Sequence, residues 1–276
     1  MNEERQFDVV IGNPPYQDPK NQATPLWQKF VTKSFAITKE VGLVSLIHPC
    51  AWRKPEHKLF DIFKINDLKY LEIHSQTDGN KVFGVGTRYD WYIAEKCDNK
   101  GNTIIVDEHG KSGKFDIRDV SCIPHSDIDL FFSLLAKRGE KSCHTLFSYS
   151  CYEPRKPWMS KEQTEEFKYP CVHATSAKGL KFRYSNTKDN GHFGIKKVII
   201  GIASPEKCFF DKNGKYGMTQ NAFAIKVDSD DEGNAIVKVM SSDKFRIILA
   251  NTKWSSFATD ESAFKYFKKD FWKEFI

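Results

Sequence analysis

The chain has 276 residues, 40% hydrophobic and 28% charged, so it can bury a substantial core and is neither a disordered chain nor a membrane protein. No apolar run approaches the roughly 20 residues that a membrane-spanning helix needs. Seven scattered cysteines without a CxxC pair favour reduced thiols in a cytoplasmic protein, and no metal site is expected. The net charge of +6 and the 14% of aromatic residues are compatible with a nucleic-acid partner but do not identify one.

Strands and helices are expected to alternate over the first hundred residues. Short runs rich in β-branched residues predict buried strands, and apolar residues at helical spacing predict helices. The expected order is strand 8–13, helix 25–38, strand 41–49, helix 52–66, strand 68–74 and strand 88–96. The last strand alternates and is rich in aromatics, so we expect it near the sheet edge. This rhythm predicts an α/β fold with a mostly parallel sheet.

The pattern changes after about Asp98. Residues 110–250 contain short segments interrupted by Gly, Asn and Pro, without a long helical period, and strands are expected at 193–203 and 221–230 in a mixed or antiparallel arrangement. We therefore expect two parts, 1–108 and 109–276.

Four phenylalanines near the end predict one C-terminal helix whose apolar stripe packs into the core. They follow helical spacing and are Phe264, Phe267, Phe271 and Phe275. Thr259 or Asp260 is the expected cap.

The sequence NPPY follows the first expected strand, where α/β sheets place their ligands. Pro14 and Pro15 lack an N–H and fix φ, so the peptide is stiff and rich in acceptors. The Asn13 side-chain oxygen and the Pro14 carbonyl can both accept from one planar amino group, which frees its lone pair for attack on an electrophile. Tyr16 offers a face on which a base can stack. A Pro-rich turn without function and a merely packing Tyr16 are the alternatives.

The segment DVVIGNPPYQ resembles the catalytic motif of adenine-N6 DNA methyltransferases, particularly the methylase modules of Eco57I-like restriction–modification enzymes. GLVSLIHPCAWRK and GNKVFGVGTRYDWYIAEK are similar to later family segments, the second of them a hairpin. The resemblance implies a partial Rossmann-like methyltransferase sheet in 1–108 and a mixed α+β target-recognition region in 109–276. It also implies methyl transfer from S-adenosylmethionine to N6 of a flipped adenine in double-stranded DNA. Phe83 would close the base pocket opposite Tyr16, unless it is a core residue.

The loop that binds S-adenosylmethionine is not found. FGVGT (83–87) imitates such a loop, but that loop needs a strand before it and a helix after it, and the sequence after it favours a strand. In the family order the loop would precede NPPY by several dozen residues, whereas 12 residues precede Asn13. We therefore expect a split or truncated methylase, a second chain that supplies the cofactor-binding half, or a DNA-binding specificity module without a cofactor site.

Residues 150–220 mix cationic and aromatic side chains, which suits phosphate contacts and base stacking. The candidate DNA contacts are Lys181, Arg183, Lys196 and Lys197, with a solvated charged face as the alternative. Methylation of RNA adenine or of a protein glutamine also uses NPPY. The basic, aromatic second half argues against a protein substrate.

Overall fold

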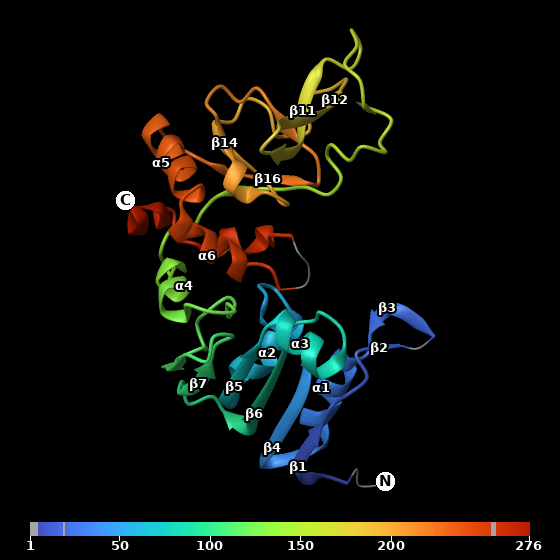
Figure 1. Ribbon diagram of the computed structural model, residues 1–276, viewed down its shortest axis with the longest axis vertical. Coiled ribbons are helices and arrows are strands. Elements are labelled where there is room, and N and C mark those ends of the chain that lie inside the picture. The colour runs from blue at the N-terminus through green and yellow to red at the C-terminus, as the bar shows by residue number, and fades with distance from the viewer. Residues whose placement is uncertain (1–4, 19, 255–257) are drawn as a thin grey trace. The chain divides into compact units, whose positions relative to one another are not determined.

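The computed structural model describes residues 5–18, 20–254 and 258–276. The chain divides into two compact units, Met1–Ser133 and Leu134–Ile276 (Figure 1). The boundary expected after residue 108 falls inside the first unit, because the next strand still pairs with its sheet. Within the described ranges, no helix has the length and hydrophobicity that crossing a membrane requires.

The first unit is built on a six-stranded sheet. In sheet order the strands are β1 (Phe7–Gly12), β4 (Thr38–Pro49), β6 (Tyr89–Asp98), β5 (Asn66–His74), β7 (Thr103–Val106) and β8 (Ser112–Phe115). The pairs β1–β4 and β5–β7 are parallel, and the other neighbours are antiparallel. The sheet is therefore mixed rather than mostly parallel. The strand expected near the edge, β6, instead lies between β4 and β5, because it pairs antiparallel with both.

Two helices cover one face of this sheet. They are α1 (Trp27–Ile37), which packs on β4, and α2 (Lys58–Ile65), which packs on β5 and β6 (Figure 1). Side chains alternate along β4: Val44 and Leu46 are buried, whereas Leu43 and Ile47 are only partly covered. The core of the unit consequently lies on the helical side of the sheet.

Strand β1 forms where predicted, but it is not buried. Its apolar side chains Phe7, Val9 and Ile11 are 46%, 56% and 78% exposed. The reason is topological, because among the described strands β1 pairs only with β4 and so lies at the edge of the sheet. The expectation of a buried strand is therefore wrong for these described residues.

A helix, α3 (Gln76–Phe83), replaces the first arm of the expected hairpin. Ser75 begins it with a capping box: the Ser75 hydroxyl accepts from the Asp78 N–H, and the Asp78 carboxylate accepts from the Ser75 N–H, each at 3.2 Å. Gly84, in the left-handed region at φ 71°, ends it. The sequence Ser-x-x-Asp was the local signal for this helix.

The first unit also contains a small hairpin and a last helix. The hairpin strands are β2 (Gln17–Asp18) and β3 (Asn21–Pro25), and the helical elements are η1 (Cys50–Arg53) and α4 (Ile128–Leu134).

The second unit contains two four-stranded sheets. Their strands pair in the mixed or antiparallel arrangement that was expected. One comprises β10 (Met159–Ser160), β12 (Gly179–Ser185), β11 (Tyr169–Ser176) and β15 (Gly217–Met218) in this order. The other comprises β14 (Phe209–Asp211), β13 (Lys197–Gly201), β16 (Ala222–Lys226) and β9 (Thr145–Leu146). Helices α5 (Asp230–Met240) and α6 (Asp243–Asn251) follow, with a short turn η2 (Pro205–Lys207) before β14.

The C-terminal segment is not the single helix that was expected. It forms two short 3₁₀ turns, η3 (Glu261–Tyr266) and η4 (Phe271–Phe275), and Asp260 rather than Thr259 caps the first. Between them Phe267 and Lys268 form bridges with Leu135 and Ser142, which interrupts helical hydrogen bonding. The core role of the phenylalanine stripe is confirmed for the three members that are buried, Phe264, Phe267 and Phe271.

We expect Gly79→Ala to destabilise the first unit by about 1–3 kcal/mol. Gly79 lies in α3 directly under the backbone of the next loop, and a Cβ there would overlap the Thr87 carbonyl oxygen. Urea unfolding measures the effect. Asn80→Ala, one position along on the exposed side of α3, is the matched control, and equal midpoints for the two variants would contradict this packing.

Candidate functional site

The NPPY segment leaves β1 at its carboxyl end and leads into the hairpin β2–β3. The Leu26 N–H donates to the Tyr16 carbonyl oxygen at 3.1 Å, which closes this loop. Pro14 is buried, Tyr16 is half-buried and Asn13 is exposed. Among the described residues, none forms a hydrogen bond with the Asn13 carboxamide. The segment thus presents an amide at the sheet edge on a stiff, anchored backbone.

Tyr16 and Phe83, the two expected walls of a base pocket, are in contact. Their ring centroids are 5.9 Å apart and their planes meet at 72°. Phe83 also contacts Tyr89 edge-on at 5.0 Å, and Tyr89 stacks on His74 at 4.4 Å. Tyr89 and His74 extend this aromatic cluster beyond the two residues that the sequence indicated. The edge-on contact leaves no parallel slot between Tyr16 and Phe83, so a base can enter only if one ring moves.

The Tyr16 hydroxyl is buried and has no hydrogen-bond partner among the described residues. Burial is the main reason that the pKa of Tyr16 rises to about 12, and nearby Tyr89 and Asp90 contribute. The phenol is therefore neutral at physiological pH. An unsatisfied buried hydroxyl costs about 1–3 kcal/mol, which a ligand acceptor would offset.

His48 lies at the end of β4, next to the NPPY strand, and is fully buried. Its ring stacks on Trp27 at 4.6 Å, and its Nδ1 lies 3.1 Å from the Pro49 carbonyl oxygen. Burial lowers the pKa of His48 to about 4. A neutral, stacked imidazole supports the strand end, as expected for a structural histidine, and is unsuited to accept a proton near pH 7.

A buried ion pair that the sequence did not indicate fixes the same sheet edge. Arg53 donates to both oxygens of Asp90, at 2.8 and 3.1 Å, and both side chains are completely buried. Trp52 Nε1 donates to the same carboxylate at 2.8 Å. The guanidinium also donates to the carbonyl oxygens of Ile123 and Pro124. This network joins the loop after β4 to β6. Burial by itself would lower the pKa of Arg53, but the Asp90 carboxylate and its other partners offset burial, so the pKa is raised.

The cofactor loop expected for a methyltransferase is not found among the described residues. The only Gly-x-Gly in the sequence, at 84–86, follows helix α3 and precedes strand β6, which reverses the required strand–loop–helix order. A glycine-rich loop that could hold S-adenosylmethionine is therefore not present among the described residues.

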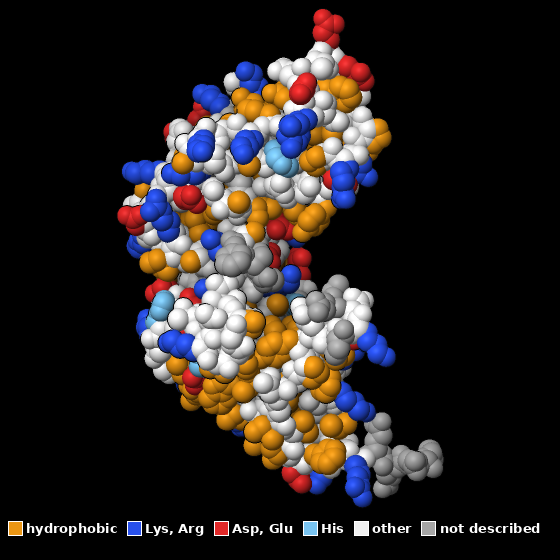
Figure 2. All heavy atoms as spheres, turned by 45° about the vertical axis from the view of Figure 1, so that its right-hand side comes forward, with side chains coloured by type: hydrophobic (Ala, Val, Ile, Leu, Met, Phe, Trp, Pro, Cys, Tyr) orange, Lys and Arg blue, Asp and Glu red, His pale blue; other side chains and the backbone are white. Residues whose placement is uncertain are grey.

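In the second unit, Lys181 and Arg183 lie two residues apart on β12 and so share one face of the sheet. Both lower the pKa of His173, after burial as the main cause, so the three side chains are near neighbours. His173 also contacts the Thr219 hydroxyl at 3.0 Å and the Asn221 amide at 3.4 Å. Lys and Arg side chains are visible around a histidine on this unit in Figure 2. No local sequence signal indicated His173, Thr219 or Asn221.

The other two predicted cations are already paired. Lys197 is completely buried, and its ammonium lies 2.8 Å from the Asp211 carboxylate. The assignment of Lys197 as a DNA contact is therefore wrong, because a phosphate cannot reach a buried ammonium. Lys196 pairs with Asp230 at 2.5 Å, which reduces its charge toward solvent.

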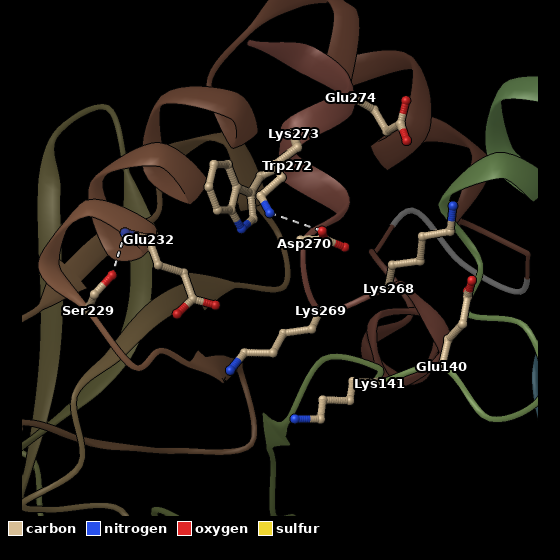
Figure 3. A pocket seen from close by; sticks show the side chains of 10 residues that line it. All are labelled: Glu140, Lys141, Ser229, Glu232, Lys268, Lys269, Asp270, Trp272, Lys273 and Glu274. Atoms are coloured by element: carbon tan, nitrogen blue, oxygen red, sulfur yellow. Dashed lines mark hydrogen bonds and ion pairs between the residues drawn. The ribbon is translucent and has the colours of Figure 1, made fainter.

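A cavity of about 860 Å³ in the second unit contains none of the predicted residues. Its lining is mixed in charge, and Lys273 pairs with Asp270 there (Figure 3). Lys269 of the lining pairs with Asp228.

Comparison with known proteins identifies the first part of the chain. Residues 1–83 match the family model described as Eco57I restriction-modification methylase. The predicted Eco57I-like methylase family is thereby confirmed for this segment. No curated protein matches the chain.

Among solved structures, the Type IIL restriction-modification enzyme MmeI, determined in complex with DNA, is similar with a TM-score of 0.50 and 9% identity. The likeness covers 94% of this chain and 45% of that chain, and it shows a shared fold alone. The type IIG restriction endonuclease BpuSI gives a TM-score of 0.39 and 10% identity over 99% of this chain and 49% of that chain. The chain thus spans less than half the length of each of these proteins.

We expect the Arg53–Asp90 pair to show strong non-additivity. Arg53→Met or Asp90→Leu alone leaves a buried, unpaired charge and should cost about 3–5 kcal/mol. The double variant removes both charges and should be clearly more stable than the sum of the single losses predicts. Urea unfolding of the four proteins gives the coupling free energy. The exposed pair Asp8–Lys39 serves as control, with no measurable coupling expected, and additive losses at 53 and 90 would refute the proposed network.

Proposed function

We propose that this chain is the target-binding part of a DNA methyltransferase from a restriction–modification system, with N6 of adenine as the methylated atom. The single observation that carries the proposal is the exposed, unengaged Asn13 beside the buried Pro14, at the end of a strand inside the Eco57I family match. We assign the six-stranded sheet of the first unit to part of a Rossmann-like methyltransferase domain and the second unit, Leu134–Ile276, to target recognition.

The residues of this chain would act on the adenine. The Asn13 side-chain oxygen and the Pro14 carbonyl accept hydrogen bonds from the exocyclic amino group, which concentrates its lone pair on the nitrogen. Pro15 keeps the backbone stiff behind them. No strong base is needed, because the amino nitrogen would carry a positive charge once it is methylated and would then lose one proton to water, in keeping with the neutral His48.

A flipped adenine would stack on Tyr16 after displacing Phe83 from its edge-on contact. Phe83 is suited to move, because it is the last residue of α3 and a loop with Gly84 and Gly86 follows it. Stacking of the base on an aromatic ring in such a pocket would contribute about 1–3 kcal/mol, which offsets part of the cost of moving the base out of the duplex.

The methyl group would come from S-adenosylmethionine bound elsewhere than on the described residues. A DNA-binding specificity module without methyl transfer is the second candidate function. The observation that favours it is that, among the described residues, no strand is joined to a helix by a Gly-x-Gly loop. The two candidates differ in whether any methylated adenine forms.

Methyl transfer tests the proposal directly. Tritium from labelled S-adenosylmethionine should enter adenine of duplex DNA when this chain is combined with the polypeptide encoded next to it. Asn13→Ala should lower the rate by about 100-fold or more, because the hydrogen bond that localises the lone pair is lost. Asn234→Ala, an exposed asparagine on α5 outside the proposed DNA-contacting stretch, should leave the rate unchanged. DNA binding without any transfer would instead support the specificity module.

The basic face of β12 predicts salt-dependent DNA binding. Lys181→Gln and Arg183→Gln should each weaken duplex binding and make the negative slope of log affinity against log salt shallower by about 0.9 per lost phosphate contact. Fluorescence anisotropy between low and moderate salt measures this slope. Lys238→Gln, an exposed lysine on α5, is the matched control. Identical slopes for all three variants and the parent would exclude this face as a phosphate-binding surface.

A further inference from the structure

Strand β11 contains a β-bulge at His173. In the pairing with β12, Val172 and Ala174 face consecutive residues, so His173 between them has no partner on β12. A bulge re-aims the side chain of its extra residue, and bulges are frequent beside functional sites. His173 is half-buried, and the charges of Lys181 and Arg183 act on it from β12. The bulge therefore places an imidazole beside the two cations of the basic face.

A tight turn holds a carboxamide next to this imidazole. The turn joins β15 to β16, and across it the Ala222 N–H donates to the Thr219 carbonyl oxygen at 3.1 Å. The Thr219 N–H donates to the carbonyl oxygen of Val172 on β11 at 3.0 Å. On the other side, the Ile202 N–H donates to the Asn221 carbonyl oxygen at 3.0 Å. The exposed side chain of Asn221 is thus carried by a backbone that is fixed on both sides.

The hydrogen bonds of His173 engage one N–H of the Asn221 carboxamide. His173 Nε2 lies 3.4 Å from Asn221 Nδ2, and His173 Nδ1 lies 3.0 Å from Thr219 Oγ1. Burial and then the nearby cations lower the pKa of His173, which favours the neutral ring. A neutral ring that accepts from the amide at Nε2 carries its proton on Nδ1 and donates it to the threonine hydroxyl. Among the described residues, the Asn221 Oδ1 and the second amide N–H have no partner.

A free acceptor beside a free donor matches the major-groove edge of adenine. There adenine presents its N6 amino group as a donor and N7 as an acceptor, and a carboxamide can pair with both at once. Guanine presents two acceptors, cytosine a donor, and thymine an acceptor and a methyl group. The remaining hydrogen-bonding groups of Asn221 are therefore complementary to adenine rather than to the other three bases.

The two cations of β12 supply the second kind of contact that a DNA reader needs. Neither Lys181 nor Arg183 forms an ion pair with a carboxylate in the part of the chain that the structure describes. Both can therefore bind phosphates. Phosphate contacts position a protein on the duplex, and contacts with base edges provide sequence specificity. The surface around His173 combines groups of both kinds.

We propose that Asn221 reads the N6 and N7 atoms of one adenine in the major groove of the target sequence, and that His173 is a positioning residue for its carboxamide. This inference rests on the proposed function, because it names how the target DNA is recognised. The adenine that is read in this way stays paired in the duplex. It is therefore a different base from the flipped adenine, whose amino group Asn13 would hold.

Selection from duplexes with a randomised segment tests the reading role. The full chain is incubated with the pool, and the bound duplexes are sequenced. The parent should enrich a sequence that contains adenine, and Asn221→Ala should lower the preference for adenine at one position by about 5-fold or more. Preferences at the other positions and the salt dependence of binding should not change. Asn234→Ala, at an exposed asparagine on α5, should keep the preference of the parent at every position.

A change in the DNA tests the same contact from the other side. 7-Deazaadenine at the selected position lacks the N7 acceptor and still pairs with thymine. It should weaken binding by the parent about 3-fold or more, because one hydrogen bond is lost. It should have no effect on Asn221→Ala, which makes no contact with N7. Fluorescence anisotropy of the two proteins with the two duplexes measures this coupling.

Two substitutions at His173 test the positioning role. His173→Phe keeps a ring but cannot accept from the Asn221 amide, so the carboxamide can rotate and the adenine preference should fall at the same position. His173→Gln provides a side-chain oxygen as acceptor and should restore part of the preference. The salt dependence and the thermal unfolding midpoint of both variants should stay near those of the parent. An adenine preference that is unchanged in His173→Phe would refute the positioning role.

The outcomes separate this inference from the proposed function. No enriched sequence, an unchanged preference in Asn221→Ala, or a loss spread over all positions would each overturn the reading role. Methyl transfer that continues at the same sequence with Asn221→Ala would also overturn it and leave the enzyme proposal standing. An adenine preference that depends on Asn221, in a protein that directs no methyl transfer, would support the reading role and overturn the enzyme proposal.

Discussion

The parallel pairing of β1 with β4 determines where the chemistry of this protein can occur. Because parallel strands end at the same edge, the register Gly12↔Leu46 brings NPPY out beside the end of β4. There the buried Arg53–Asp90 pair ties the following loop to β6. The motif is therefore anchored by β4, which pairs with one edge of β1. Among the described residues, no strand pairs with the other edge of β1. The position of the NPPY segment at this end of the sheet depends on this one pairing.

Local signals predicted much of the first unit, and long-range pairing accounts for what they missed. Runs such as VGLVSLIHP identify strands wherever they lie in a sheet, so β1, β4 and β5 were expected correctly. The alternation in β6 is the same for an edge strand and a central one. Its position between β4 and β5 is set by antiparallel partners that are distant in sequence. The burial of β1 was mispredicted for the same reason, since burial depends on neighbours and not on composition alone.

The candidate site divides in the same way. The four residues of NPPY are contiguous, so their shared role could be predicted from the sequence. Phe83 was expected opposite Tyr16 only because of the family resemblance, and the two rings are in contact. The pair Arg53–Asp90 and the cluster around His173 join positions far apart along the chain and had no such signal. A lysine also looks identical whether exposed or buried, and only the approach of Asp211 shows that Lys197 belongs to the interior.

The two prolines also limit how far another strand can extend along β1. A strand that pairs with the outer edge of β1 needs backbone N–H donors, and neither Pro14 nor Pro15 has one. Pairing along the outer edge of β1 must therefore stop near Gly12. In the proposed function, the residues that would present acceptors to an amino group are thus the same residues that end strand pairing, which gives a physical reason for a stiff turn after such an apolar strand.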